Sequence, residues 1–244
     1  MKIGIISDIH SNSEAINCVL KNIKEVDEII CLGDIVGYGA DPNYCIEKLK
    51  DLNCRCIGGN HDLAVLGKVN INYFNYAARA AILWTTLQLK KENLNFLLNL
   101  KKKIDLGDDV FAVHGSPQNP LLEYILDKNT ASSIFNKFDF KIYFVGHSHL
   151  AGCFSFNKNN NQIDYLNFNN GGHIEIHKNK RYIINCGSVG QPRDGNSKAS
   201  YGIYDLKYDT VNIYRVSYPI DLTKRKIINA GLPRSLADRL SYGR

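Results

Sequence analysis

The chain has 244 residues, of which 44% are apolar and 22% are charged, so the composition argues against an intrinsically disordered protein. Its net charge of +6 is spread along the chain rather than clustered, which is compatible with anionic ligands and gives no clear nucleic-acid groove. No apolar run reaches the roughly 20 residues that cross a bilayer, and the start lacks a leader pattern, so we expect a cytoplasmic protein with no membrane partner.

The first half of the chain alternates strand and helix patterns. A helix is predicted from Asn12 because Ala15, Ile16 and Val19 fall on one face, and Asp41-Pro42 is a typical start of another. The predicted strands are 2–7, 28–32, 55–58, 109–113 and 142–145. The predicted helices are 12–25, 42–52, 72–99 (one helix or two) and 121–138.

From Ala151 onward the pattern changes to short strands separated by polar turns. These strands are predicted at 153–156, 163–166, 174–176, 182–185, 201–204 and 211–216, before a helical tail at about 220–244 that is broken near 231–233. The runs Lys101–Lys103 and Lys224–Lys226 are interpreted as solvated helix ends. The whole predicts one domain, 1–244, of mixed α/β type built on two sheets, with its seven cysteines as reduced thiols.

Five short polar motifs each follow a predicted strand. Since the carboxyl ends of parallel strands converge on one crevice, they can meet there although they are far apart in the sequence. Taken alone, D-x-H would be interpreted as a polar strand end and G-D or G-N-H-D as a turn, while G-H-x-H alone is a moderate signal for a metal site. The motifs are Asp8-Ile9-His10, Gly33-Asp34, Gly59-Asn60-His61-Asp62, His114-Gly115 and Gly146-His147-Ser148-His149.

The residue types in these motifs fit a site for two metal ions. Carboxylate, amide and imidazole donors without thiolates suit Mn, Fe, Zn, Co or Ni, and manganese is our first expectation. In D-x-H, both side chains reach one ion only where the chain is leaving the strand and turning. The adjacent glycines allow tight turns or a close backbone approach. The candidate ligands are Asp8, His10, Asp34, Asn60, His114, His147 and His149.

The pattern D-x-H, G-D, G-N-H-D, H and G-H-x-H resembles the calcineurin-like metallophosphoesterase superfamily, and the stretches 7–12, 33–39, 114–117 and 185–195 resemble its small bacterial and archaeal phosphodiesterase branch. The resemblance covers about residues 1–217, with further similarity around 231–233. It implies a four-layer α-β-β-α sandwich of two mixed sheets. It also implies that Asp8, His10 and His149 hold one ion, that Asn60, His114 and His147 hold the other, and that Asp34 bridges them.

The same resemblance implies that His61 faces the substrate as a catalytic residue. Related phosphatases often have a G-D-x-x-D-R stretch whose second Asp orients this histidine, but Gly37 stands at that position here. Asp62 is a substitute, or it fixes the turn instead.

The expected reaction is in-line attack on phosphorus by a hydroxide bridging two ions, with His61 donating a hydrogen bond or proton to the leaving oxygen. Arg193 is expected to hold a non-bridging oxygen, or alternatively to pair with Asp194 or another acid. Tyr38 and Asn12 are further candidate substrate contacts. The segment 74–98 either covers the site or simply packs.

The expected substrate is a small phosphate ester, possibly a nucleotide, and a phosphodiester first. A phosphomonoesterase, a dinucleoside polyphosphate hydrolase and a nuclease are alternatives within enzymes. A non-catalytic metal-binding interaction scaffold is the alternative of another class. The sequence leaves the natural substrate and the oligomeric state open.

Overall fold

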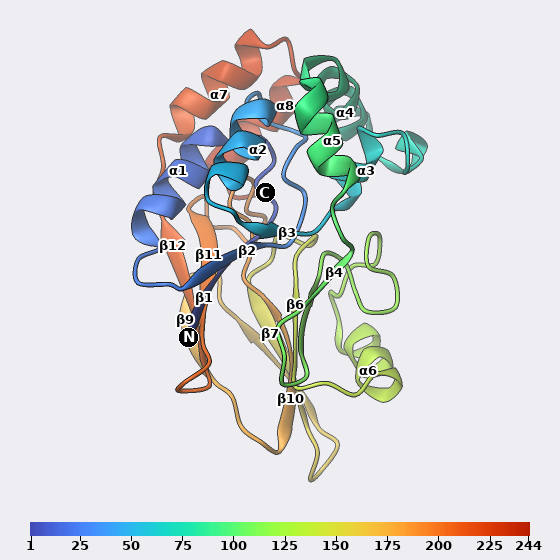
Figure 1. Cartoon of the computed structure of the whole chain (residues 1–244), viewed down its shortest axis with the longest axis vertical. Coiled ribbons are helices and arrows are strands. Elements are labelled where there is room, and N and C mark those ends of the chain that lie inside the picture. The colour runs from blue at the N-terminus through green and yellow to red at the C-terminus, as the bar shows by residue number, and fades with distance from the viewer.

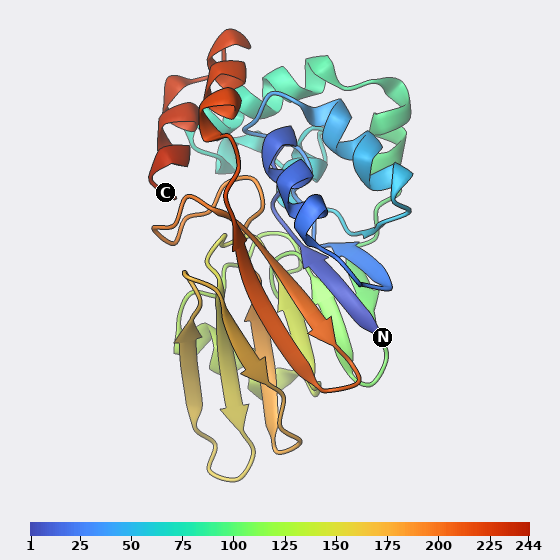
Figure 2. The same cartoon turned by 90° about the vertical axis from the view of Figure 1, so that its left-hand side faces the viewer.

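The computed structural model describes residues 1–244 and places twelve strands in two six-stranded sheets that pack face to face (Figure 1, Figure 2). The first sheet has the order β3 (Arg55–Cys56), β2 (Glu28–Cys31), β1 (Lys2–Ile6), β11 (Ala199–Asp205), β12 (Thr210–Val216) and β9 (Gly172–Glu175). The second has the order β4 (Lys103–Asp105), β5 (Val110–Val113), β6 (Ile142–Val145), β10 (Lys180–Asn185), β7 (Gly152–Asn157) and β8 (Ile163–Asn167).

Both sheets are mixed, and the parallel strands are the ones that lead into the polar motifs. In the first sheet β1, β2 and β3 run parallel, and in the second β5, β6 and β10 do so. The remaining strands pair antiparallel with their neighbours, on one side of the parallel strands in the first sheet and on both sides in the second. The loops after the parallel strands therefore leave the sandwich at one edge.

The strand β1 shows how the layers are held together. Ile3 and Ile5 point into the core between the two sheets, while Ile6 points to the opposite face, where it packs with Ile16 of α1 (Ser13–Asn22). Burial on both faces explains why this strand is a continuous apolar run rather than an alternating one. Each fully buried isoleucine contributes about 1.5–3 kcal/mol to folding.

Helices cover both outer faces, which confirms the four-layer α-β-β-α arrangement. The helices α1 and α2 (Pro42–Asp51) pack on the first sheet, and α6 (Lys128–Lys137) packs on the second, where it is seen at the right of Figure 1. The remaining helices are α3 (Asn60–Ala64), η1 (Ile71–Tyr73), α4 (Tyr76–Gln88), α5 (Lys91–Leu98), α7 (Ile220–Asn229), α8 (Arg234–Asp238) and η2 (Arg239–Ser241). No helix of this structure has both the length and the apolar character that a membrane span requires.

The structure corrects one predicted helix. The helix expected over 121–138 begins only at Lys128, because the Asp127 carboxylate accepts hydrogen bonds from the first backbone N–H groups and so acts as its N-cap. Residues before it form a loop whose start is held by Ser116, whose hydroxyl accepts from the backbone N–H groups of Gln118 and Asn119.

The basic run Lys101–Lys103 was wrongly interpreted as a solvated helix end, while Lys226 of the second run does lie in the last turn of α7. Lys103 begins strand β4, and Lys101 forms a parallel bridge with Ile57, so the first run lies at the edge of the sheets. In the second run, Lys226 of α7 forms ion pairs with Glu14 and Asp41 at distances of 2.5 and 2.7 Å. These pairs attach the C-terminal tail to the body of the molecule.

Candidate metal centre

The loops after five parallel strands bring all seven candidate ligands to one buried place. One group of donor atoms is contributed by Asp8, His10, Asp34 and His149, and a second by Asp34, His114 and His147. Within each group the donor atoms lie within 4.8 Å of one another. Asn60 extends the second group, since its Oδ1 lies 3.0 Å from His114 Nε2. Asp34 belongs to both groups, so the geometry contains two adjacent clusters with one shared carboxylate.

We call Asp8, His10 and His149 the first half of the centre, and Asn60, His114 and His147 the second half. Asp34 joins them. Its Oδ2 lies 3.6 Å from His10 Nε2 and 3.4 Å from His114 Nε2, which is one contact to each half. This is the position expected for a bridging carboxylate.

The backbone of these loops is turned sharply at the ligands. Asp8 and His10 have φ values of 54° and 49°, and His147 and His149 have values of 64° and 61°. Such left-handed backbone is uncommon outside glycine, although Asp and His tolerate it better than most residues. It lets both members of D-x-H and of H-x-H point toward one centre, as this spacing requires.

Two glycines allow the ligand loops to approach one another. A Cβ atom at Gly59 would lie 2.1 Å from Asp34 Oδ1, and one at Gly146 would lie 2.1 Å from Ser7 Oγ. Neither position has room for a side chain. The glycines beside the ligands thus serve close backbone approach, as predicted.

Three imidazoles are fixed by backbone carbonyl groups in the orientation that a metal site needs. The Nδ1 atoms of His10, His114 and His149 lie 3.1, 2.8 and 2.6 Å from carbonyl oxygens. A ring that donates its Nδ1–H to a carbonyl presents the lone pair of Nε2 on its other side. The accepting carbonyls belong to Val36, Leu32 and Gln191.

The Nε2 lone pairs of these histidines face one another, so the donor atoms can be checked for their fit to a bound cation. His10 Nε2 and His149 Nε2 are 3.2 Å apart, and with both protons on Nδ1 no hydrogen joins them. The buried Nε2 of His147 has no hydrogen-bond partner at all. Buried polar atoms without partners are costly, and converging nitrogen and oxygen lone pairs are what a divalent cation satisfies. The residues present therefore fit the metal ions that the donor set implies.

The electrostatics of the centre show the same need for positive charge. Burial raises the pKa of Asp8 to about 7. Burial also opposes the charge on Asp34, but His114 and His61 hold its pKa well below the usual value. Against the effect of burial, Asp34 raises the pKa of His114 to about 9. A proton on His114 thus compensates a buried carboxylate, and metal binding to such ligands releases protons.

His61 lies between the two halves without a carboxylate to orient it. Its backbone N–H donates to Asp34 Oδ1 at 2.8 Å, while its Nδ1 has no partner. The ring packs against Tyr38 and Phe74, with centroid distances of 4.5 and 5.0 Å. A Cβ at Gly37 would lie 2.5 Å from His61 Nδ1, so the ring lies directly against this glycine and leaves no room for a side chain there. Packing alone orients it, and burial lowers its pKa to about 4.

Of the two roles predicted for Asp62, the structure supports fixing the turn rather than orienting His61. Its carboxylate accepts hydrogen bonds from the backbone N–H groups of Gly59 at 2.9 Å and Val36 at 3.0 Å. It therefore fixes the turn and ties the loop after β3 to the loop after β2.

Arg193 approaches the first half of the centre. Its guanidinium donates to the Tyr38 hydroxyl at 3.3 Å and to Gln191 Oε1 at 2.8 Å, and it pairs with no carboxylate. The predicted alternative of a pair with Asp194 is wrong, because Asp194 binds Arg215 instead. The Arg193 charge is thus left available beside the site.

Asn12, a predicted substrate contact, lines a small cavity with His10 and Tyr38. It is buried, and its Oδ1 caps α1 by accepting from Ala15 N–H at 3.0 Å. Its amide donates to the Gly190 carbonyl, and its Oδ1 also accepts from Thr223. With these contacts its side chain serves the fold.

One aromatic residue beside the centre was not found from the sequence. The ring of Tyr124 lies flat on that of His147, with centroids 3.8 Å apart and an angle of 13° between planes. The residue lies in the segment that was wrongly predicted to be helical. Nothing in its spacing from the histidines signals the contact, since it comes from the path of a loop.

Comparisons with known proteins agree with this picture. The calcineurin-like phosphoesterase superfamily domain matches residues 1–209. The uncharacterized protein MJ0912 of Methanocaldococcus jannaschii is 45% identical over 99% of this chain and 98% of its own length.

Two solved structures share the fold over the full chain. A metallophosphoesterase from Sphaerobacter thermophilus has a TM-score of 0.88 with 40% identity and complete coverage of both chains. The hypothetical protein PH1004 from Pyrococcus horikoshii has a TM-score of 0.81 with 20% identity, covering 100% of this chain and 98% of its own. At that identity the second match supports the fold alone.

Proposed function

The chain belongs to the calcineurin-like phosphoesterase superfamily, and we propose that it is a phosphodiesterase working with two divalent ions. Membership of this family supports hydrolysis of phosphoesters. The finer proposal is supported chiefly by one observation, the two buried donor clusters that share Asp34.

We assign one ion to the first half of the centre and the other to the second half, with Asp34 a ligand of both. Manganese is the first choice, and Fe, Zn, Co or Ni would suit the same donors. When bound, such a pair of ions lowers the pKa of water and neutralises charge on the phosphoryl oxygens. Asp8 and Asp34 contribute two negative charges, so the loaded centre stays electropositive and favours an anionic substrate.

The protein's own side chains would complete the site. His61 is buried beside Asp34 with an unpartnered ring nitrogen, and we assign it the hydrogen bond or proton given to the leaving oxygen. Arg193 would hold a non-bridging phosphoryl oxygen. Tyr38 contacts both His61 and Arg193 and would fix their positions relative to each other.

A diester is favoured over a monoester by the charge available at the site. A diester carries one negative charge and a monoester close to two. Arg193 is the one basic side chain that donates a hydrogen bond to Tyr38 at the first half, so one guanidinium is in place for the single negative charge of a diester.

The test is hydrolysis of bis(p-nitrophenyl) phosphate and of p-nitrophenyl phosphate by the Mn²⁺-loaded protein. We expect the diester to have the higher kcat/KM, and Asp34→Asn to abolish both activities. Asp51→Asn, an exposed carboxylate on α2, is the matched control and should leave them unchanged. A higher rate on the monoester would replace the proposal by a phosphomonoesterase. Tight metal binding with no hydrolysis would support the scaffold instead.

A further inference from the structure

A cleft opens directly beside the second half of the centre. Its volume is about 290 Å³, close to the lower end of the range for small-molecule sites. Its only polar lining residues other than tyrosine are two candidate metal ligands, and it has no charged side chain. The lining residues are Asn60, Tyr73, Phe74, Leu122, Tyr124 and His147. We call it the aromatic cleft.

The cleft is formed by two segments that are far apart in the sequence. One is the turn around η1, and the other is the loop before α6 that contains Leu122 and Tyr124. In Figure 1 the turquoise segment near η1 and the green loop below it lie along the same side of the molecule. Both segments are insertions between core strands, where substrate selectivity can vary without disturbing the fold.

Two of its aromatic walls are anchored to functional side chains. Tyr124 is stacked flat on His147, and Phe74 meets the ring of His61 edge-on with centroids 5.0 Å apart and an angle of 78°. The walls are thus held by the residues assigned to metal binding and to the leaving group. A group bound in the cleft would lie beside both.

The chemistry of the lining defines the group that fits. Tyr73 is 77% exposed, Tyr124 44% and Leu122 40%, which is a large apolar area left open to water beside a centre built for anions. A phosphate ion or a charged chain would gain nothing from it. A flat ring gains stacking contacts, and because the cleft is open, the polar edge of a heteroaromatic ring can remain hydrated.

We propose that the aromatic cleft binds the base of a nucleoside attached to the phosphoryl group, and so selects nucleotide-type phosphodiesters over alkyl ones. This rests on the proposed function in that the phosphoryl group must lie at the metal centre. Tyr73 and Tyr124 are the specificity-determining residues, and neither is assigned a part in bond cleavage.

The test is calorimetric titration of the Mn²⁺-loaded protein with two phosphonates, the analogues of AMP and of ribose 5-phosphate. Their C–P bond resists hydrolysis, and they differ only in the base. Stacking of one base on aromatic side chains is worth a roughly 5- to 150-fold difference in affinity, so the adenine compound should bind tighter by that ratio. Tyr73→Ala should lower its affinity and leave that of the ribose compound unchanged. Tyr124→Leu, at a residue that also contacts His147, should lower the ratio of the two affinities.

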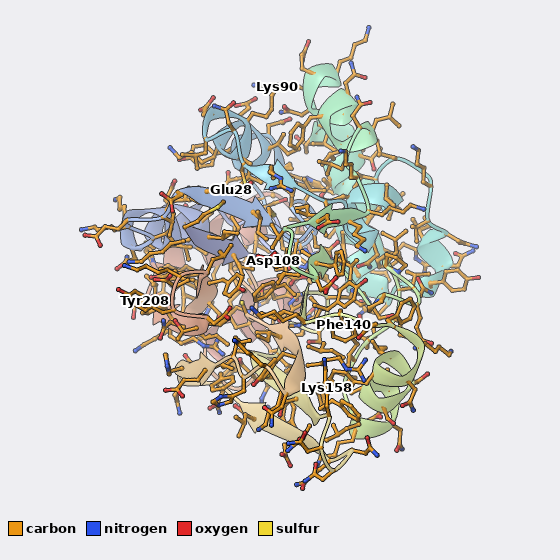
Figure 3. All side chains as sticks on the ribbon, turned by 60° about the horizontal axis from the view of Figure 1, so that its bottom comes forward. Glu28, Lys90, Asp108, Phe140, Lys158 and Tyr208 are labelled. Atoms are coloured by element: carbon orange, nitrogen blue, oxygen red, sulfur yellow. The ribbon has the colours of Figure 1, made fainter.

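Tyr208→Ala is the matched control, because Tyr208 is 66% exposed and lies across the molecule from the η1 segment (Figure 3). Equal affinity for the two phosphonates, or a ratio that survives in both cleft variants, would overturn the proposal. The affinities are measured by binding alone and do not depend on turnover. A base preference without phosphodiester hydrolysis would leave the cleft assignment standing and remove the proposed function, while hydrolysis without a base preference would do the reverse.

Discussion

The two halves of the candidate metal centre are buried to similar extents but are covered differently. In the first half, His10 and His149 are each 1% exposed, and both rings are fixed by backbone carbonyls. Above them lie Tyr38 and the C-terminal helices, which pack together in one apolar cluster. In the second half, His147 has a free Nε2 and is covered by Tyr124, a residue that is itself 44% exposed.

From this difference in cover we expect the first half to serve mainly metal retention and the second half to lie next to the substrate. The first half is embedded in the fold, since its covering elements are attached to the body by buried contacts. The second half borders the aromatic cleft and can be reached from solvent. Changes in the first half should therefore act on metal retention and stability, and changes around the second half should act on turnover and selectivity.

The largest effect is expected where the halves meet. Asp34→Asn removes the shared negative charge and weakens the ligand set of both ions, so kcat/KM should fall by roughly 10³-fold or more, the equivalent of the several kcal/mol that metal catalysis supplies. Elemental analysis should show both ions reduced together. Loss of only one ion would mean that Asp34 is a ligand in a single half of the centre.

A smaller loss, roughly 10²–10³-fold in kcat, is expected for His61→Ala, within the range of general acid–base contributions. His61 donates to Asp34 only through its backbone, which the substitution keeps. Metal content should thus remain that of the parent protein. Full activity in this variant would exclude His61 from the reaction.

Metal binding should also be visible as stability. At a free Mn²⁺ concentration of about 100 times the dissociation constant, binding adds about 2.7 kcal/mol and should raise Tm by roughly 5–10 °C for a chain of this size. Asp8→Asn should remove most of this shift, while His147→Asn should leave a part of it. Equal losses in the two variants, measured by calorimetry with and without chelator, would show that the halves bind their ions as one unit.

Much of this centre could be predicted from the sequence because its chemistry is carried by residue types at strand ends. Asp8, Asp34 and His114 are polar side chains placed directly after apolar runs, and parallel strands must deliver such ends to one edge. The expected turn in D-x-H was confirmed by the left-handed backbone at Asp8 and His10.

What could not be predicted depends on paths of loops and on long-range polar contacts. Tyr124 reaches His147 only because Asp127 delays the start of α6 and leaves a loop before it. Asn12 resembles a site residue, yet it is used by the cap of α1 and by Thr223, 211 positions away. The cap is a local pattern, but the contacts of Tyr124 with His147 and of Asn12 with Thr223 join distant segments and are not visible in one.

The smallest effect is expected at Lys226, which joins the C-terminal tail to α1 next to the first half. Its ammonium contacts Glu14 and Asp41, and the side chain is 35% exposed. After allowance for solvent screening, Lys226→Met should cost roughly 0.5–1.5 kcal/mol, or a Tm decrease of about 1–6 °C.

Burial opposes the charge on Lys226, but Asp41 and Glu14 raise its pKa above the ordinary 10.5. A raised pKa in the folded state contributes stability that is fully present below pH 10.5 and is lost as the pH rises through the folded value. The difference in Tm between the parent and Lys226→Met should therefore be constant near neutral pH and shrink in strongly alkaline buffer. Arg225→Met, at an exposed neighbouring position of α7, should show no comparable change. A difference that persists at alkaline pH would mean that the methylene chain of Lys226, rather than its charge, holds the tail against the first half.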